Sequence, residues 1–389
     1  MASIDSLLIK RLCYLEQINE MTDKYRQKTG FVVPNISGWE ISEDYKTSML
    51  KNFSADSYLN YDPIDYVYSY NITCSRRQEI VTRLGGHADT MPLIVPNNTI
   101  ALTNTINFLS HLNISNVGLL LPCYFTVPNL LNNRKISFKS LPLLHLDTDY
   151  TLPREQIRKS NCQALILTSP VFSTGLYLND NDIDFLSEYL KSGKYIISDE
   201  SIAAPGKELI RKLGDSHRFV SIYSPHKFIH FNSFKFSCIL YDERYEDFFD
   251  QWNDVYSGSL NITNMQAVHH YLSDNYMEML ENFYKFTDKN RQKLNELISV
   301  FPKFHTDSNT IGDYICLYNN EIPYKLGNRL NFIRNVLCNT NSIFYPGCLH
   351  GFQKEHGFVF RINLVSYSPI VGTALLKILD CLSEYNSLL

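Results

Sequence analysis

The sequence predicts an α/β protein with a large domain and a smaller α+β domain. Between about residues 60 and 270, short runs of β-branched and apolar residues alternate with stretches of helical spacing. The predicted strands are apolar almost throughout, which is typical of a mostly parallel sheet covered on both faces. At 389 residues, the chain is also long enough for two domains. After about residue 275, a long charged helix and shorter strands replace this alternation and predict the smaller domain.

The elements can be placed in order along the chain. Apolar residues at helical spacing predict an N-terminal helix that ends near Gly30. Further helices are predicted at residues 182–190, 276–297 and 371–382. Six strands of the large domain are predicted at residues 100–103, 117–121, 164–168, 195–198, 219–222 and 236–240. We expect an N-terminal arm and part of the small domain in 1–50, the large domain in 51–270, and the small domain in 271–389.

Composition and charge exclude several classes of protein. The 36 basic and 40 acidic residues leave a net charge of −4, so no nucleic acid or anionic membrane is expected as a partner. No apolar run approaches the roughly 18 residues of a membrane span, and charges between Met1 and Gln17 argue against a signal peptide. Nine cysteines occur singly, which favours a reducing compartment over disulfides or zinc. We predict a cytoplasmic protein with no metal.

Lys227 is the residue that says most about function. It follows the predicted strand at 219–222, and open α/β sheets bind ligands at the carboxyl ends of their strands. A lysine placed there is partly desolvated, so its pKa falls and the free amine becomes available for Schiff-base chemistry. Ser224, three residues earlier, and Lys235, eight residues later, could both bind a phosphate. A Schiff-base lysine beside a phosphate site indicates pyridoxal phosphate.

Further segments carry polar or aromatic side chains at the expected ends of strands. Thr103, Asn104 and Thr105 are placed where a strand turns into a helix, which would offer backbone N–H groups to a phosphate. Tyr124 follows the next strand, Ser169 to Gly175 form a turn after another, and Asp199 ends a fourth. Arg361 lies in the C-terminal part.

In this order, the segments resemble the class I/II aminotransferases, which are fold-type I pyridoxal-phosphate enzymes. The resemblance runs from about Tyr66 to Leu382. Residues 169–175 resemble the family's Asn-Pro-x-x-x-Thr-Gly turn, and residues 199–202 resemble its Asp-Glu-x-Tyr motif. Residues 224–227 resemble its Ser-x-Ser-Lys motif, and residues 233–235 its Gly-x-Arg motif. Residues 361–364 resemble the Arg-Ile motif that binds the substrate carboxylate. The resemblance implies a mostly parallel seven-stranded sheet in a large cofactor-binding domain, a smaller α+β domain, and a homodimer with shared active sites.

The resemblance also implies roles for individual residues. Lys227 would form the Schiff base and move a proton at the substrate Cα, while Asp199 would keep the pyridine nitrogen protonated. Tyr124 would stack on the ring, and Arg361 would bind the substrate α-carboxylate. Phosphate ligands would be Asn104, Thr105, Ser224 and Lys235, with Thr103 beside them and Ser169 near the ring. Gly38 resembles the glycine of the arm that closes over the substrate. Tyr70, Tyr68 or Tyr66 would reach the partner subunit's phosphate.

Departures from the family pattern leave the reaction open. Ile202 and Ser169 replace a tyrosine and an asparagine that hydrogen-bond the cofactor's phenolic oxygen, and Lys235 replaces an arginine. Transfer of an amino group from an L-amino acid to a 2-oxo acid is the favoured function. A lyase, cyclase or oxidase of an amino acid, as in natural-product pathways, is the alternative. A non-catalytic relic of the fold is disfavoured because both Lys227 and Asp199 are present.

Structural roles compete with the functional ones at several positions. Asp199, Asn104 and Thr105 could cap helices, Arg361 could form an ion pair, and Tyr124 could pack in the core. His226 and His230 are spaced like a metal pair on a helix, but no third ligand is near, so no metal is expected. His226 could tune Lys227, contact the substrate, or simply pack.

Overall fold

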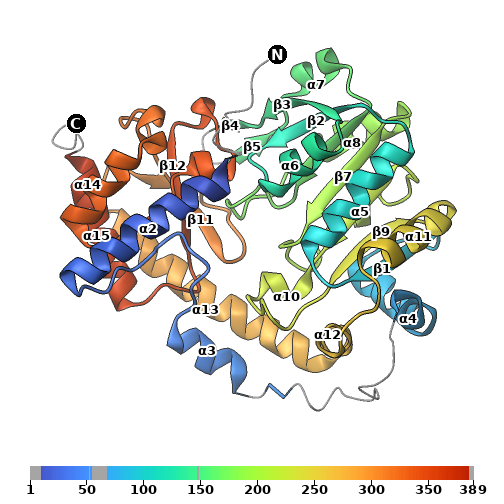
Figure 1. The fold of residues 1–389 in the computed structure, drawn as a ribbon, viewed down its shortest axis with the longest axis horizontal. Helices are drawn as coiled ribbons and strands as arrows, with labels where there is room; N and C mark the ends of the chain where they lie inside the picture. Colours follow the sequence, from blue (N-terminus) through green and yellow to red (C-terminus); the bar gives the residue numbers. More distant parts are fainter. Residues whose placement is uncertain (1–9, 52, 55–67, 147–148, 385–389) are drawn as a thin grey trace.

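A seven-stranded sheet forms the centre of the larger part of the molecule (Figure 1). The computed structural model describes residues 10–51, 53–54, 68–146 and 149–384. The spatial order of the strands is β1-β9-β8-β7-β6-β2-β3, and only β9 runs antiparallel to its neighbours. The strands are β1 (Thr90–Val95), β2 (Asn116–Leu121), β3 (Ser137–Pro142), β6 (Ala164–Thr168), β7 (Tyr195–Glu200), β8 (Phe219–Tyr223) and β9 (Ser237–Asp242). The predicted mostly parallel sheet in an α/β fold is confirmed.

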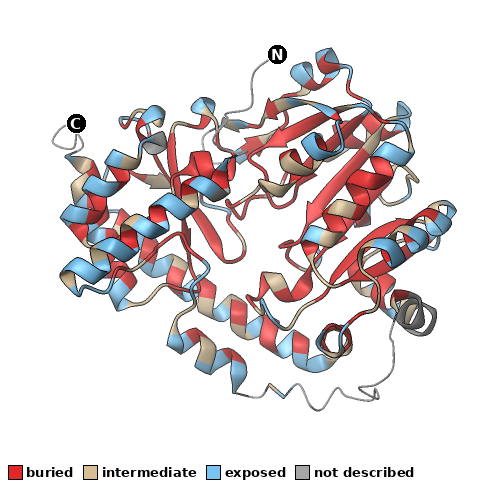
Figure 2. Ribbon diagram, in the orientation of Figure 1, coloured by how far each residue is buried: buried red, intermediate tan, exposed pale blue. Residues whose placement is uncertain are grey.

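Helices cover both faces of this sheet. Along β6, Leu165 and Leu167 face one hydrophobic core and Ile166 faces the other, as the period of two in a strand requires. Figure 2 shows the strands buried between helices whose inner faces are also buried. These helices are α4 (Ser69–Leu84), α5 (Asn98–His111), α6 (Thr126–Asn133), α7 (Arg154–Ser160), α8 (Asp180–Lys191), α9 (Ile210–Leu213), α10 (Pro225–Phe228), α11 (Glu246–Tyr256) and α12 (Ile262–Leu272).

The smaller part is built around a three-stranded antiparallel sheet in the order β10-β11-β12. Its strands are β10 (His305–Thr306), β11 (Tyr314–Asn319) and β12 (Phe358–Asn363), and a separate hairpin pairs β4 (Leu144–Leu146) with β5 (Asp149–Thr151). Its helices are α13 (Asp274–Ile298), α14 (Leu330–Thr340) and α15 (Pro369–Ser383). Short 3₁₀ helices lie at Glu243–Tyr245, Tyr324–Asn328, Gly347–His350 and Lys354–His356.

The N-terminal segment packs on the smaller part, as Figure 1 shows for α2 (Arg11–Thr29) beside α14 and α15. Tyr14 and Ile18 of α2 share a core with residues of α14, α15 and β12. The helix ends where Gly30 takes the left-handed conformation (φ 71°) and donates its N–H to the Arg26 carbonyl at 2.8 Å. A second helix, α3 (Glu43–Leu50), contacts α13.

Helix α13 connects the two parts of the molecule. Its first half contributes Tyr276 and Phe283 to the core of the larger part, and its second half contributes Leu294 and Ile298 to the core of the smaller part. The predicted boundary at residue 270 stays a prediction, because the helix belongs to both cores. No helix in the described part of the chain combines the length and the apolar character needed to cross a membrane.

One predicted strand is wrong. Residues 100–103 lie in helix α5, and the strand of this region is β1, ten residues earlier. The Asn97 side chain caps the helix by accepting a hydrogen bond from the Ile100 N–H at 3.1 Å. Helix α5 is buried on most of its circumference, so its sequence lacks the apolar and polar faces that would have marked it as a helix. The other five predicted strands coincide with β2, β6, β7, β8 and β9.

Candidate active site

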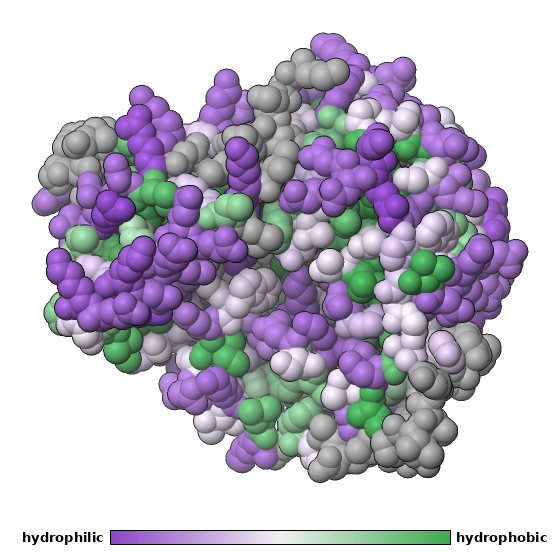
Figure 3. Space-filling view, in the orientation of Figure 1, coloured by the Kyte–Doolittle hydropathy of each residue, from purple (hydrophilic) through white to green (hydrophobic). Residues whose placement is uncertain are grey.

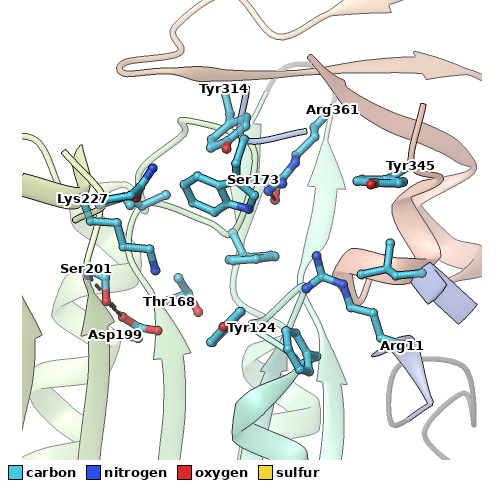
Figure 4. Close-up of a pocket in the computed structure, with 16 residues that line it drawn as sticks. Arg11, Tyr124, Thr168, Ser173, Asp199, Ser201, Lys227, Tyr314, Tyr345 and Arg361 are labelled. Atoms are coloured by element: carbon cyan, nitrogen blue, oxygen red, sulfur yellow. Dashed lines mark hydrogen bonds between the residues drawn. The ribbon is translucent and has the colours of Figure 1, made fainter. Parts of the chain in front are cut away.

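A cavity of ≈ 510 Å³ opens where the carboxyl ends of the central strands face the smaller part of the molecule. Parallel strands end at the same edge of a sheet, and this edge is where α/β folds bind ligands. Thr168 at the end of β6 pairs in register with Asp199 of β7, and both side chains line the cavity. Lys227 reaches it from α10, directly after β8. Figure 4 shows these side chains on one side of the cavity and those of Arg361, Tyr345 and Arg11 on the other.

The Lys227 amine is a desolvated base that faces the cavity. Its Nζ lies 5.3 Å from the ring centroid of Tyr124 and 5.8 Å from that of Trp39. Burial lowers the pKa of Lys227 from its ordinary value, and repulsion from Lys235 and Arg361 acts in the same direction. Attraction by Asp199 and Asp313 partly opposes these effects. A larger fraction of the free amine is therefore present near neutral pH than for a surface lysine.

Asp199 is held by hydrogen bonds to one of its two carboxylate oxygens. Oδ1 accepts from the Ser201 backbone N–H at 3.2 Å and also from the Ser201 hydroxyl. Oδ2 has only a long contact, 3.4 Å from Nδ2 of Asn98. Asp199 itself is buried, so this arrangement fixes the carboxylate, and Oδ2, beside the long hydrogen bond from Asn98, can accept a further one from a bound molecule.

Arg361 is a buried cation on β12. Its Nε donates to the Ser37 carbonyl at 3.0 Å, and its Nη1 lies 3.2 Å from the Ser173 hydroxyl. The guanidinium also packs over the Tyr314 ring, 4.3 Å from its centroid. Among the described residues, no carboxylate forms an ion pair with Arg361. The side chain is therefore anchored by neutral groups and keeps its charge for a ligand.

Aromatic side chains contribute six of the sixteen residues that line the cavity. Tyr124 follows β2 immediately before α6, as expected, and Phe125 beside it is in edge contact at 4.8 Å between ring centroids. The ring centroid of Phe172, in the turn after β6, lies 6.1 Å from that of Tyr124. Such walls suit a flat ligand with polar groups at its ends.

Four of the predicted site residues lie near the cavity but not in its lining. Ser224 is buried, with its hydroxyl 2.5 Å from that of Ser237 at the start of β9. Lys235 lies two residues before β9 and is close enough to Lys227 to lower its pKa. The Gly38 carbonyl accepts from Asn363 Nδ2 at 3.1 Å, which places the neighbouring Trp39 against the cavity. Ser169 is buried and does not line the cavity. Ile202, which stands where the family pattern has a tyrosine, does line the cavity.

The expectation for Thr103, Asn104 and Thr105 is wrong, because all three lie inside helix α5 rather than at its start. The hydroxyls of Thr103 and Thr105 donate to carbonyls of their own helix, at 2.8 and 3.0 Å. Asn104 is fully buried in the helix interior, and neither atom of its amide has a partner within the described chain. These three residues are therefore not available to a phosphate.

The free N–H groups of α5 lie instead at residues 97–99, directly after β1. The first turn of a helix has unpaired N–H groups and the positive end of the helix dipole. Asn98, in this turn, is buried and contacts Asp199, and its Oδ1 has no partner within the described chain. The helix start that was predicted at 103–105 therefore lies at 97–99.

His226 also differs from expectation. Its side chain does not line the cavity; Nε2 lies 3.0 Å from Nδ1 of His270 on α12, and the ring packs against Phe234, Phe236 and Tyr276. Burial lowers the pKa of His226 well below its usual value, so the ring is neutral. Of the three roles left open, packing matches the structure, contact with a substrate does not, and tuning of Lys227 stays a prediction.

The three tyrosines expected to reach a partner subunit are only partly covered by the structure. Tyr66 and the side chain of Tyr70 lie outside the described residues, and Tyr68 is half-buried immediately before α4. Sequence reasoning missed other residues of the lining, namely Arg11, Trp39, Ser173, Ser201, Tyr314 and Tyr345. Arg11 carried a signal, because it continues the buried stripe of Tyr14, Ile18 and Thr22 on α2.

The fold matches that of many solved aminotransferases. The alanine aminotransferase from Pyrococcus furiosus superposes with a TM-score of 0.75 at 14% identity over 98% of both chains. The N-succinyldiaminopimelate aminotransferase from Mycobacterium tuberculosis gives 0.74 at 15% identity, over 94% of this chain and 96% of that one. The chain has the fold-type I fold.

A lyase is among the proteins with this fold. The pyridoxal-phosphate-bound C–S lyase from Staphylococcus hominis superposes with a TM-score of 0.69 at 15% identity, over 90% of this chain and 92% of that one. No protein-family model and no curated protein matches the sequence. At these identities the comparisons confirm the predicted fold, and the chemistry has to be argued from the residues of the cavity.

Proposed function

We propose that this chain is a pyridoxal-phosphate-dependent aminotransferase that moves an amino group from an L-amino acid to a 2-oxo acid, with Lys227 covalently attached to the cofactor. The observation that carries the proposal is the meeting of the Lys227 amine, the Asp199 carboxylate and the Arg361 guanidinium in one cavity. They come from the large sheet and from β12, far apart in the sequence.

The residues present fit this cofactor. Lys227 offers a free amine with no ion pair in the described chain, and Asp199 offers an oxygen that Ser201 leaves free. Tyr124 offers a ring surface in the lining. The backbone N–H groups of the first turn of α5, the Ser224 hydroxyl and Lys235 would supply hydrogen-bond donors and charge for a phosphate.

When bound, pyridoxal phosphate would supply an aldehyde that reacts with amines and a ring that withdraws electrons from the substrate Cα. Lys227, with its lowered pKa, would move the proton between the substrate Cα and the aldehyde carbon of the cofactor. Asp199 would hold a proton on the ring nitrogen through Oδ2. Arg361 would bind the α-carboxylate and so orient the bond to be broken.

Trapping the amine tests this proposal. Borohydride reduction of the protein loaded with pyridoxal phosphate should leave the cofactor on Lys227, as read by peptide mass spectrometry. The Lys227→Ala variant should lose the label and about 10²- to 10⁴-fold of its turnover with an amino acid and a 2-oxo acid. Lys285→Ala, on the exposed face of α13, is the matched control and should keep both. Labelling at another lysine, or turnover that survives in Lys227→Ala, would refute the proposal.

A second function is favoured by one observation. Ile202 lines the cavity where the family has a tyrosine, and Ser169 does not line it. The loss of both hydrogen bonds to the phenolic oxygen would change the reactivity of the cofactor and suits a lyase, cyclase or oxidase. A 2-oxo acid distinguishes the two functions: repeated turnover of an amino acid without any acceptor would favour the second.

A further inference from the structure

A second arginine points into the cavity without an anion. Arg11 begins helix α2, and its side chain is 5% exposed. Its guanidinium carbon lies 4.7 Å from the Phe125 ring centroid, across the cavity from Lys227 in Figure 4. Its Nε and Nη1 have no hydrogen-bond partner within the described chain. A side chain of this kind normally reaches for water or a carboxylate, and Nε and Nη1 of Arg11 do neither within the described chain.

Arg11 and Arg361 are close enough to repel each other. Burial first, and then the charge of Arg361, lower the pKa of Arg11 to about 10. The guanidinium therefore stays protonated at neutral pH despite both effects. Besides Lys227, the described lining holds two arginines, Arg11 and Arg361, and one carboxylate, Asp199, which Ser201 already holds. The cavity has an excess of positive charge that a ligand would neutralise.

A purely structural role leaves these facts unexplained. The contact with Phe125 would anchor α2 by a cation–π interaction. An aromatic face, however, accepts no hydrogen bond at Nε or at Nη1. The outer side of α2 is covered by hydrophilic side chains in Figure 3, so an arginine on that side would have remained in water. Arg11 lies instead on the buried stripe of the helix.

We propose that Arg11 binds a second carboxylate, at the far end of the substrate side chain, and so selects dicarboxylic amino acids and their 2-oxo acids. This inference rests on the proposed function, in which Arg361 binds the α-carboxylate. The fork of N–H donors on a guanidinium matches a planar carboxylate. Tyr345 and Tyr124 line the same cavity as the two arginines, and they provide aromatic surface for the carbon chain. The proposed function already uses Arg361 for the α-carboxylate and Lys227 for the cofactor, so the described lining leaves Arg11 alone for a second anion. A single guanidinium suits one carboxylate better than a phosphate dianion.

Paired substrates that differ by one charge test the inference on the holoenzyme. The rate of cofactor absorbance change would be measured with L-glutamate, L-glutamine and L-2-aminoadipate in single half-reactions. The wild type should prefer one of the two dicarboxylates over glutamine. Arg11→Gln should lower the ratio of kcat/KM for that dicarboxylate to kcat/KM for glutamine by about 10- to 100-fold, mostly through KM. Arg11→Lys should recover part of the ratio, and Arg361→Gln should lower both rates.

A binding measurement separates failure of this inference from failure of the proposed function. Calorimetry with glutarate and with butyrate needs no turnover, and Arg11→Gln should weaken glutarate binding selectively. The role of Arg11 would be overturned if Arg11→Gln weakened the binding of glutarate and butyrate equally and lowered kcat/KM equally for the preferred dicarboxylate and for glutamine. A wild type that prefers glutamine would also overturn it. If no amino acid reacts while glutarate binding still depends on Arg11, the anion site stands and the aminotransferase function falls. Circular dichroism of each variant checks that α2 is intact.

Discussion

At the scale of single residues, the charged side chains around the cavity shift one another's pKa values. Burial and the charges of Lys235 and Arg361 lower the pKa of Lys227. The charges of Asp199 and Asp313 raise it. The signs come from position alone: cations disfavour an ammonium and carboxylates favour it. Chemistry at Lys227 therefore depends on the charges around it, including that of Asp313, which does not line the cavity. Removing one of these charges should shift the titration of Lys227 in a known direction.

The titration of Lys227 in the apoprotein gives the first prediction at this scale. Lys235→Gln removes a positive neighbour, so the pKa of Lys227 should rise toward its ordinary 10.5. Asp199→Asn removes a negative neighbour, so the pKa should fall further. The measurement is the rate of acylation of Lys227 as a function of pH, followed by peptide mass spectrometry, with exposed Lys285 as the internal reference. Shifts of the two variants in the same direction would contradict the assignment of charges around the amine.

At the scale of elements, the sequence predicted the strands that carry the chemistry and misplaced a helix. Strands such as β6 and β8 are apolar throughout and end in polar residues, so their position and their ends could be read directly. Helix α5 is buried nearly all round, and its run of Ile100 to Thr103 imitates a strand. A capping asparagine after a proline was the local signal for its true start.

Residues brought in from distant elements were harder to predict. Trp39, Tyr314 and Tyr345 line the cavity because the smaller part of the molecule packs against the large sheet. Nothing local in their sequence surroundings distinguishes them in a chain with 26 tyrosines. Only the resemblance to a family supplied Arg361 and Gly38, and no family pattern supplied Arg11.

The start of α5 gives a prediction at the element scale. Asn97→Ala removes the cap of α5 and should lower the free energy of unfolding by about 1 kcal/mol. Because the phosphate is assigned to this turn, the variant should also bind pyridoxal phosphate several-fold more weakly. Asn179→Ala removes the equivalent cap of α8, whose Oδ1 accepts from the Asp182 N–H at 3.0 Å. Thermal unfolding and fluorescence titration would be measured on both proteins.

The comparison of the two caps decides whether α5 binds the phosphate. Asn179→Ala should lose stability to a similar extent and keep its affinity for the cofactor, because Asn179 caps α8 and the phosphate is proposed at the start of α5. Equal affinities in the two variants would place the phosphate away from residues 97–99.

At the scale of the whole molecule, the cavity takes its charges from two parts with separate cores. The large sheet provides Lys227 and Asp199, while α2 and β12, which share the other core, provide Arg11 and Arg361. A substrate with a carboxylate at each end would therefore contact both parts at once. The long helix α13 contributes residues to both cores and so connects the two parts.

The homodimer predicted from the family resemblance belongs to this scale as well. The start of α4 is fixed against β1, since the Ser69 hydroxyl accepts from the Ile94 N–H at 2.9 Å. β1 is the outermost strand of the sheet, and no described residue of α4 lines the cavity. A tyrosine just before or inside the start of α4, namely Tyr66, Tyr68 or Tyr70, is therefore expected to serve the cavity of a partner subunit.

Mixing two inactive proteins tests this arrangement. Lys227→Ala lacks the amine, and Tyr70→Phe should bind the cofactor weakly, so each should have low activity at limiting pyridoxal phosphate. In a mixed dimer, one cavity would combine the intact Lys227 of one subunit with the intact Tyr70 of the other. Random pairing should restore about one quarter of the wild-type activity, since half of the dimers have one complete cavity of two. Tyr68→Phe and Tyr66→Phe mixed in the same way would identify which tyrosine crosses, and activity that never exceeds the mean of the separate variants would rule out a shared cavity.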